Sequence, residues 1–457
     1  MKIIQNAVNF AKQDIGKNIT GIFIIKLISM CISFFSMPLY MKYFKDDSVL
    51  GAWYTILSIV NWIYIFDFGM GNSLRNKLVF ALTNKDYGLG RSYIETSYTI
   101  VSVIASVFII IAVIATRLID LNSLFDVSSS QISPFILNRV VLILSIGVIL
   151  CFSLKTINAV LFAYQKAMFT SISTLCSSVF MLLFIFLYRS DNQETALTAL
   201  GITHSLAIVI PLLVTTVITF STHEGRKIRP YRLRFKYGKY KDLLSLGITF
   251  FAIQILSLFV ISTNEMMITN IFSSSDVVEY SIYHKVFNVA SSVVVLAVVP
   301  IWSKITQYIS KNEYNKVKQT YKRLLKVDIA ACILIFLMVP VLQIGFNLWL
   351  KSETIKVNYF YALIFAFYTS CYISSIVLTT VANGTGKLKP QLIYNLAAAV
   401  LKIPLVLWLA GVYSSWITVL ISVCVPMSVF CFFQHRANTR LINHYRQSDD
   451  KKVCLTK

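Results

Sequence analysis

Four basic residues lie inside long apolar stretches of this 457-residue chain: Lys26, Arg139, Lys285 and Lys402. A lysine or arginine at the centre of a bilayer costs at least ~2.5 kcal/mol and usually faces a wet interior. Such an interior, lined by ammonium and guanidinium groups, would attract a phosphate or diphosphate. We therefore predict that these residues line a cationic cavity, the path of an anionic substrate.

Structural roles compete with this prediction. Arg139 lies near the outer end of its stretch, so its side chain could extend to the surface. Lys285 could instead form an ion pair with Glu265 or Glu279. Lys26 and Lys402 lie farthest from either surface and are the stronger candidates for the path.

Four other titratable residues are candidates for coupling to an ion gradient. Asp67 closes one apolar stretch, while Glu265, His204 and His284 lie within others. Imidazole titrates near neutral pH, and a carboxylate inside a membrane protein commonly marks an ion path. The alternative is that both histidines are packed residues and that Asp67 is structural. No Cys or His spacing indicates a metal site, and we expect no cofactor besides a coupling proton or sodium ion.

Apolar helices must position these residues. The chain is 56% hydrophobic and 14% charged, with a mean hydropathy of +0.70. This hydrophobic fraction is larger than the core of a soluble protein needs. A run of ~20 apolar residues crosses the ~30 Å of hydrocarbon, and in lipid it must bond its own backbone as a helix. We predict twelve membrane-spanning helices, at 17–41, 48–66, 93–116, 134–154, 168–188, 196–220, 243–266, 277–300, 327–350, 358–382, 391–410 and 412–434.

The net charge of +22 would suggest nucleic acid as the partner of a soluble protein, but its distribution indicates membrane topology. With the first residue in the cytosol, cytosolic segments hold 32 of the 42 Lys and Arg, and outer loops hold six. This bias places both termini in the cytosol. The largest basic block, 226–241, is then a topology signal on the anionic inner leaflet, and no nucleic acid is expected.

The chain is repeated within itself. A shift of 228 residues aligns Phe44 with Phe272 and Asn84 with Asn312. Each half opens with a long span, a short outer loop, a second span and an amphipathic cytosolic stretch, which in the second half is 302–326. Six spans per half is an even number, so the halves point the same way and would be related by an axis along the membrane normal. We predict an all-α membrane protein with two six-helix lobes around a central cavity, divided as 1–222 (first lobe), 223–242 (basic linker), 243–434 (second lobe) and 435–457 (cytosolic tail).

The second span ends in FDFGMGNSLRNKL, which predicts a corner at the cytosolic surface. Gly69 and Gly71 permit a sharp turn from a crossing helix to a surface helix. Asp67 could hold this corner by pairing with Arg75 or Arg91.

The stretch 72–84 then has an amphipathic pattern. Leu74, Leu78 and Leu82 repeat at four-residue spacing, and Arg75 lies off that stripe. We expect a helix in the plane of the interface, with its leucines in lipid and its cations near headgroups.

The same stretch resembles a family signature. FDFGMGNSLRNKL is similar to the acidic-Gly-x-Gly-Asn-x-x-Arg-Asn-Lys-Leu motif of the Wzx-type O-antigen flippases. The preceding PLYMKYFKDDSVLGAWYTI resembles the same family's entry to the second span, with Gly51 and Trp53 in the expected places. The resemblance implies membership of the multidrug/oligosaccharidyl-lipid/polysaccharide exporter (MOP) superfamily.

That resemblance also implies a function. It implies a secondary transporter of the bacterial inner membrane, not an enzyme, that moves a repeat unit of O-antigen or capsule linked to undecaprenyl diphosphate. The unit would pass from the cytosolic to the periplasmic leaflet by alternating access, driven by a proton or sodium gradient. Membrane lipids, a polysaccharide polymerase and a chain-length regulator are the other partners that it implies.

Two alternatives remain. An ion-coupled multidrug antiporter of the same superfamily would favour acidic residues in its cavity. A membrane-embedded glycan polymerase or transferase would normally carry a large outer loop with paired carboxylates. Here the longest predicted outer loop, about 117–133, has only Asp120 and Asp126.

The charge bias makes the topology testable by cysteine-accessibility labelling. Residues 226–241 and 303–326 should label only from the cytosol, and residues 189–194 and 351–356 only from outside, because the basic segments stay on the side of synthesis. Labelling of 226–241 from outside would reverse the whole orientation.

Overall fold

The computed structural model describes residues 14–44, 49–50, 53–54, 56–57, 64, 68–122, 132–232, 237–272, 274–350 and 356–455. In this part of the chain the regular structure is helical, without strands, and ten helices are long and apolar enough to cross a membrane. Most of the predicted span 48–66 lies outside the described residues, as does Asp67.

The contacts divide the chain into two compact units, Met1–Ile248 (unit 1) and Thr249–Lys457 (unit 2). The helices of unit 1 are α2 (Asp14–Tyr43), α4 (Met70–Thr83), α5 (Tyr87–Leu118), α7 (Pro134–Leu154), α8 (Thr156–Ala163), α9 (Ala167–Leu187), α10 (Gln193–Ser221) and α11 (His223–Ile228). Helix α12 (Tyr237–Ser262) begins in unit 1 and continues into unit 2. The other elements of unit 2 are α13 (Asn264–Ile271), α14 (Ser274–Ser310), α15 (Tyr314–Met338), η1 (Val339–Val341), α16 (Leu342–Leu350), α17 (Tyr359–Thr385), α18 (Lys389–Val412) and α19 (Ile417–Leu455).

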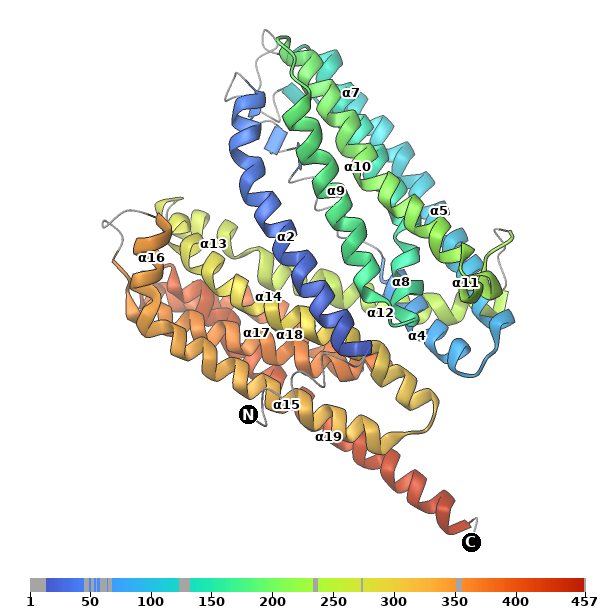
Figure 1. The fold of residues 1–457 in the computed structure, drawn as a ribbon. Coiled ribbons are helices and arrows are strands. Elements are labelled where there is room, and N and C mark those ends of the chain that lie inside the picture. The colour runs from blue at the N-terminus through green and yellow to red at the C-terminus, as the bar shows by residue number, and fades with distance from the viewer. Residues whose placement is uncertain are drawn as a thin grey trace. The chain divides into compact units, whose positions relative to one another are not determined.

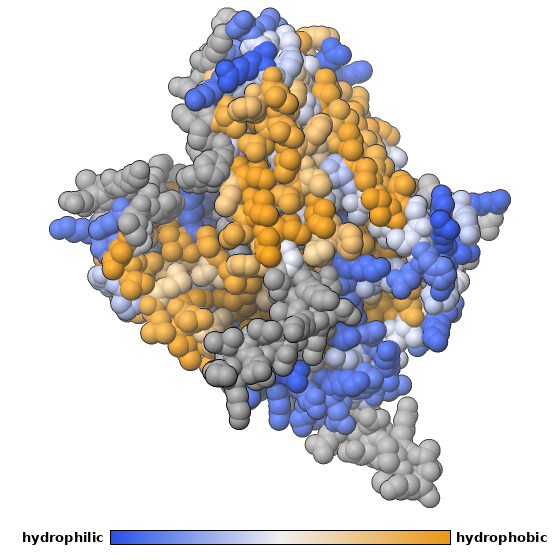
Figure 2. Space-filling view, viewed as in Figure 1, coloured by the Kyte–Doolittle hydropathy of each residue, from blue (hydrophilic) through white to orange (hydrophobic). Residues whose placement is uncertain are grey.

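In unit 1, α7 packs between α5 and α10, and α2 packs on α9 (Figure 1). Small residues allow α7 and α10 to approach closely. A Cβ on Gly147 would lie 2.6 Å from Cβ of Ser205, and one on Gly201 would lie 3.0 Å from a methyl of Val140. Close approach through small residues is the usual way in which helices associate in a membrane. Figure 2 shows apolar residues along the helices of this unit and hydrophilic residues at their ends.

In unit 2, α17 is the central helix and contacts α14, α15 and α19. Aromatic rings fill the space beside it. The rings of Tyr283 and Phe287 stack on Phe365, with centroids 5.4 and 5.7 Å away. Offset stacking of this kind adds to the free energy gained from the buried area.

Several predicted spans differ from the helices. The predicted span 134–154 coincides with α7, but the predicted span 243–266 is interrupted at Thr263, between α12 and α13. The predicted span 277–300 continues through Pro300 as the single helix α14, which takes in the first part of the amphipathic stretch 302–326. Proline lacks the amide hydrogen, but neighbouring helices can satisfy the carbonyl that it leaves free.

The chain bends where the sequence predicts a corner after the second span. Phe68 and Gly69 have positive φ values of 53° and 67°, so the chain turns sharply at the start of α4. Gly71 lies inside the first turn of α4 and takes no part in this bend.

The prediction that α4 lies in lipid is wrong. Leu74 and Leu78 are completely buried, and α4 packs against α5 and α8. Arg75 is also buried, and its guanidinium lies 4.6 Å from the ring centre of Phe162 in α8. A leucine stripe on a helix marks an apolar neighbour, and here that neighbour is protein.

Three turns between helices share one backbone geometry. After α4, α8 and α14 the chain passes through a left-handed residue: Lys85 (φ 58°), Gln165 (φ 60°) and Asn312 (φ 57°). Lys85 and Asn312 are 227 residues apart, one fewer than the shift of 228 found in the sequence. In each turn the next amide donates to the carbonyl five residues back, as in a Schellman motif: Asp86 to Ala81 (2.9 Å), Lys166 to Leu161 (2.8 Å) and Glu313 to Tyr308 (2.8 Å).

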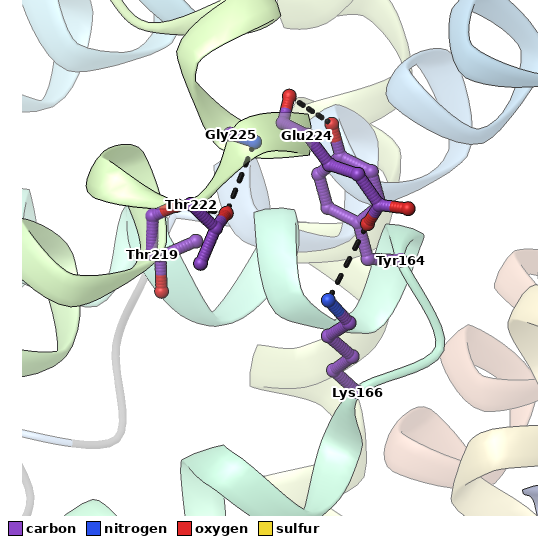
Figure 3. A network of polar contacts seen from close by, with 6 residues as sticks. All are labelled: Tyr164, Lys166, Thr219, Thr222, Glu224 and Gly225. Carbon is purple, nitrogen blue, oxygen red and sulfur yellow. Dashed lines mark hydrogen bonds and ion pairs between the residues drawn. The ribbon is translucent and has the colours of Figure 1, made fainter.

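The turn after α8 is fastened to α11 (Figure 3). Lys166 Nζ lies 3.3 Å from a carboxylate oxygen of Glu224, and the hydroxyl of Tyr164 donates to the Glu224 carbonyl at 3.1 Å. Thr222 Oγ1 accepts from the amide of Gly225 at 3.1 Å and so caps α11. Only glycine fits at 225, because a Cβ there would lie 1.9 Å from the Thr219 carbonyl oxygen.

The left-handed turns allow a matched test of backbone strain. Lys85→Gly should stabilise the protein by about 1 kcal/mol, because a left-handed L-residue costs ~1–2 kcal/mol and glycine loses part of that gain to the unfolded chain. Gly386→Ala should have the opposite effect. Gly386 has φ +70°, so an alanine there is strained even though no neighbouring atom lies within 4 Å of the position that its methyl group would take. Thermal unfolding in detergent measures both, and equal midpoints for the two variants would contradict this account.

Candidate functional site

The four predicted basic residues fall into two groups. Lys402 on α18 is completely buried in unit 2. Lys26 on α2, Arg139 on α7 and Lys285 on α14 are exposed. The sequence placed Lys26 and Lys402 at similar depths in their spans. In the structure Lys402 is buried, whereas Lys26 is exposed.

Lys402 is held by neutral oxygens at the break between α12 and α13. Its ammonium donates to the Val260 carbonyl, to Thr263 Oγ1 and to Asn264 Oδ1, each at 2.7 Å. The carbonyl of Phe259 lies farther away, at 3.5 Å. The last carbonyls of a helix have no partner within the helix and carry its negative dipole end. Lys402 therefore stabilises the break in α12, and its three hydrogens are all used.

The Lys402 contacts continue into the core of unit 2. Asn264 Nδ2 lies 3.3 Å from the hydroxyl of Tyr280, whose ring stacks on His284 at 5.4 Å. His284 is thus packed beside this cluster. The deletion of such a donor leaves buried acceptors unsatisfied, at ~1–3 kcal/mol each.

The exposed cations remain candidates for a wet path. Lys26 lies on a face of α2 with the exposed apolar residues Phe23 and Leu27. Among the described residues, Lys285 forms no ion pair with Glu265 or Glu279, so the structural tie considered above is absent. Glu279 instead accepts a hydrogen bond from Trp416 Nε1 at 2.9 Å.

The candidate coupling residues have different surroundings, and only Glu265 and His284 of unit 2 interact electrostatically among the described residues. Asp67 lies outside the described residues, and Glu265 is exposed on α13. His204 on α10 contacts Trp53 edge to face, with ring centres 5.9 Å apart, and its Nδ1 is buried without a hydrogen-bond partner in the described part of the chain.

His204 lines a cavity inside unit 1 of about 290 Å³. Its walls come from α2, α7, α8, α9 and α10, with Tyr64. The polar wall residues are hydroxyl, amide and imidazole groups, and no Asp, Glu, Lys or Arg of the described residues lines it. A second residue on this wall, Asn158, also has a buried oxygen without a partner in the described structure. The sequence reasoning missed this cavity, although the hydroxyls of TSISTLCSS at 170–178 were its visible signal.

The sequence reasoning also missed a buried acid. Asp328 lies near the middle of α15 and is 8% exposed. Its two carboxylate oxygens accept from Ser374 Oγ of α17 at 3.0 and 2.9 Å, and Cys332 Sγ lies 3.9 Å from Oδ1. It was overlooked because it falls at the edge of the predicted span 327–350, whereas α15 begins thirteen residues earlier, at Tyr314.

Comparison with known proteins gives a sequence relative and a fold. No family model matches the chain. A putative O-antigen export protein of Yersinia pseudotuberculosis is 23% identical over 386 residues, which are 80% of this chain and 82% of that protein. This match confirms the resemblance to the O-antigen flippases.

Solved structures of MATE transporters have the same fold. A MATE transporter in the bent conformation superposes with a TM-score of 0.75 at 12% identity, over 97% of this chain and 98% of that chain. An outward-facing multidrug resistance MATE transporter of the MOP superfamily gives 0.69 at 14% identity, over 96% and 99%. A Vibrio cholerae MATE transporter in the bent form gives 0.68 at 13% identity, over 95% and 99%.

These matches confirm the predicted fold class, since MATE transporters have twelve helices in two lobes. The sequence relative and the structural neighbours are membrane transporters and not enzymes. The chain therefore has the fold of the MATE transporters, and its sequence is similar to that of an O-antigen export protein.

Proposed function

We propose that this protein is a flippase that moves an oligosaccharide repeat unit linked to undecaprenyl diphosphate from the cytosolic to the periplasmic leaflet of the bacterial inner membrane. The match to an O-antigen export protein over most of both chains carries the proposal. Both termini would lie in the cytosol. A polysaccharide polymerase and a chain-length regulator would act on the delivered unit.

The placement of charge supports an anionic cargo. The diphosphate is the part of the substrate that cannot cross hydrocarbon unaided, because an ion in lipid loses its hydration. Lys26, Lys285 and Arg139 are exposed on helices long enough to cross the membrane. An ammonium or guanidinium group there can meet the diphosphate through charge-assisted hydrogen bonds.

A multidrug antiporter is the second candidate, because the structural neighbours include multidrug transporters. A carboxylate on the wall of its binding cavity would neutralise a cationic drug. The cavity in unit 1 has none among the described residues, which favours the flippase.

Transport against a gradient needs a coupled ion, and we propose Asp328 as the residue that binds it. An acid inside a membrane helix is costly unless it has a function or a partner. The hydrogen-bond partners of Asp328 are a hydroxyl and a thiol, which neutralise no charge. A proton or a monovalent cation would neutralise it.

The division of the basic residues into two groups predicts different mutant phenotypes. Lys26→Ala should leave abundance unchanged but lower flipping roughly tenfold, because a hydrogen bond to a charged group contributes ~1.5–3 kcal/mol. Lys26→Arg should retain more activity, since it keeps the charge. The assay is surface glycan restored to a deletion strain, with protein level measured in parallel and Lys322→Ala, an exposed lysine of the predicted cytosolic stretch, as the control.

Lys402 should behave differently. Lys402→Met keeps the apolar stem but leaves the acceptors at the α12 break without a donor, so abundance and activity should fall together. Lys402→Arg should not rescue it, because the planar guanidinium does not fit a site built for three convergent donors. If Lys402→Met is normally abundant but does not flip the substrate, Lys402 contacts the substrate and its role is not structural.

The coupling proposal is tested by Asp328→Asn, which resembles a permanently protonated acid. It should preserve folding and the bond to Ser374, yet remove the response of flipping to an imposed pH or sodium gradient. Flipping of a lipid-linked oligosaccharide in proteoliposomes, with and without each gradient, measures this. An unchanged gradient response in Asp328→Asn would show that Asp328 only links α15 to α17 and does not bind the coupled ion.

A further inference from the structure

The cavity of unit 1 is partly open, since Thr174 on its wall is exposed, and its lining is rich in hydroxyl groups. On α9, hydroxyl residues recur at three- and four-residue spacing, so that they share one face of the helix. Five of the six hydroxyl residues of α9 line the cavity: Thr170, Ser173, Thr174, Ser177 and Ser178. A second groove along α9 and α10 is mainly apolar, with Phe180, Ile210 and Val214 in its lining, although Ser173 lines both.

The hydroxyls of α9 retain their capacity to accept. Thr174 donates to the Thr170 carbonyl at 3.2 Å, and Ser177 donates to the Ser173 carbonyl at 3.1 Å. A hydroxyl that donates to its own helix still has lone pairs, and it can turn to donate elsewhere. This wall therefore offers both donors and acceptors to an occupant.

Two residues of the cavity wall have a buried polar atom without a hydrogen-bond partner among the described residues. Nδ1 of His204 and Oδ1 of Asn158 have no hydrogen-bond partner in the described structure. They come from α10 and α8, so polar groups on three helices converge on the same space. Buried polar groups are nearly always bonded, and one without a protein partner indicates a ligand or ordered water.

The chemistry of the lining selects a class of ligand. Without Asp, Glu, Lys or Arg among the described lining residues, the wall has no permanent charge to neutralise a cation or an anion. An apolar ligand would leave the lone pairs of these hydroxyls without a donor. A sugar ring has hydroxyls that both donate and accept, and it has C–H faces that can pack on the rings of Tyr40 and Tyr64. At about 290 Å³ the cavity is at the lower end of the usual ~300–1,000 Å³ for ligand sites, so it would hold one ring and not a chain.

We propose that this cavity binds one uncharged sugar ring of the lipid-linked head group during transport. The inference rests on the proposed function, and it assigns recognition of the sugar to unit 1. The charged diphosphate is excluded from this cavity and meets the exposed cations elsewhere.

The test uses purified full-length protein and simple probes. Methyl glycosides of a neutral hexose and of an N-acetylhexosamine are the sugars, with inorganic phosphate and tetraphenylphosphonium as the anion and cation. Saturation-transfer NMR detects weak binding of each. We expect a saturation-transfer signal from at least one glycoside. Any signal from phosphate or from the phosphonium ion should be the same in the wild type and in variants of the cavity.

Paired variants locate the binding. Thr174→Val with Ser177→Ala removes two hydroxyls at nearly constant volume and should weaken glycoside binding about fivefold. Ser106→Ala is the matched control, because Ser106 is exposed on α5 and donates to the Ser102 carbonyl at 3.0 Å in the same way. Thermal unfolding establishes that all variants remain folded.

The outcomes separate this inference from the proposed function. Glycoside binding that is absent, or equal in the double variant and the wild type, overturns the sugar cavity. If vesicles containing the wild-type protein still flip a lipid-linked oligosaccharide, the flippase proposal survives that failure. Phosphonium binding that is lost in the double variant would overturn both and favour the multidrug antiporter.

Discussion

The absence of water in the hydrocarbon core is the constraint on which this structure depends. Each backbone group must be bonded within a helix, and each polar side chain must find a partner or a wet cavity. Lys402 meets this constraint by taking the carbonyl that the break in α12 leaves free, together with Thr263 and Asn264. The hydroxyls of α9 meet it differently, because they face a cavity. The first arrangement is closed and structural, while the second is open to a ligand.

The sequence predicted the helical membrane fold, because runs of apolar residues leave few other structures available in lipid. It could not predict what each helix faces. Leu74 and Leu78 have the same spacing whether they meet lipid or protein, and here they pack on α5 and α8. Arg75 was expected at headgroups for the same reason and is instead buried over Phe162.

The candidate site was predicted less completely than the fold. Depth in a span did not predict burial, since Lys26 is exposed and Lys402 is buried. The Val260 carbonyl that helps to hold Lys402 lies 142 residues away in the chain. Asp328 was hidden at the edge of an apolar run, since a carboxylate lowers the hydropathy that defines the run. The cavity of unit 1 depends on five helices together, so no single stretch of sequence reveals it.

The central claim is that this transporter carries a lipid-linked oligosaccharide. The most direct measurement is the identity and leaflet of the undecaprenyl-linked glycans in cells that lack the protein. If the claim holds, complete repeat units on undecaprenyl diphosphate accumulate and stay inaccessible to a sugar-modifying enzyme added to the periplasmic side. Units that do not accumulate, or that are fully accessible from the periplasm, would contradict it.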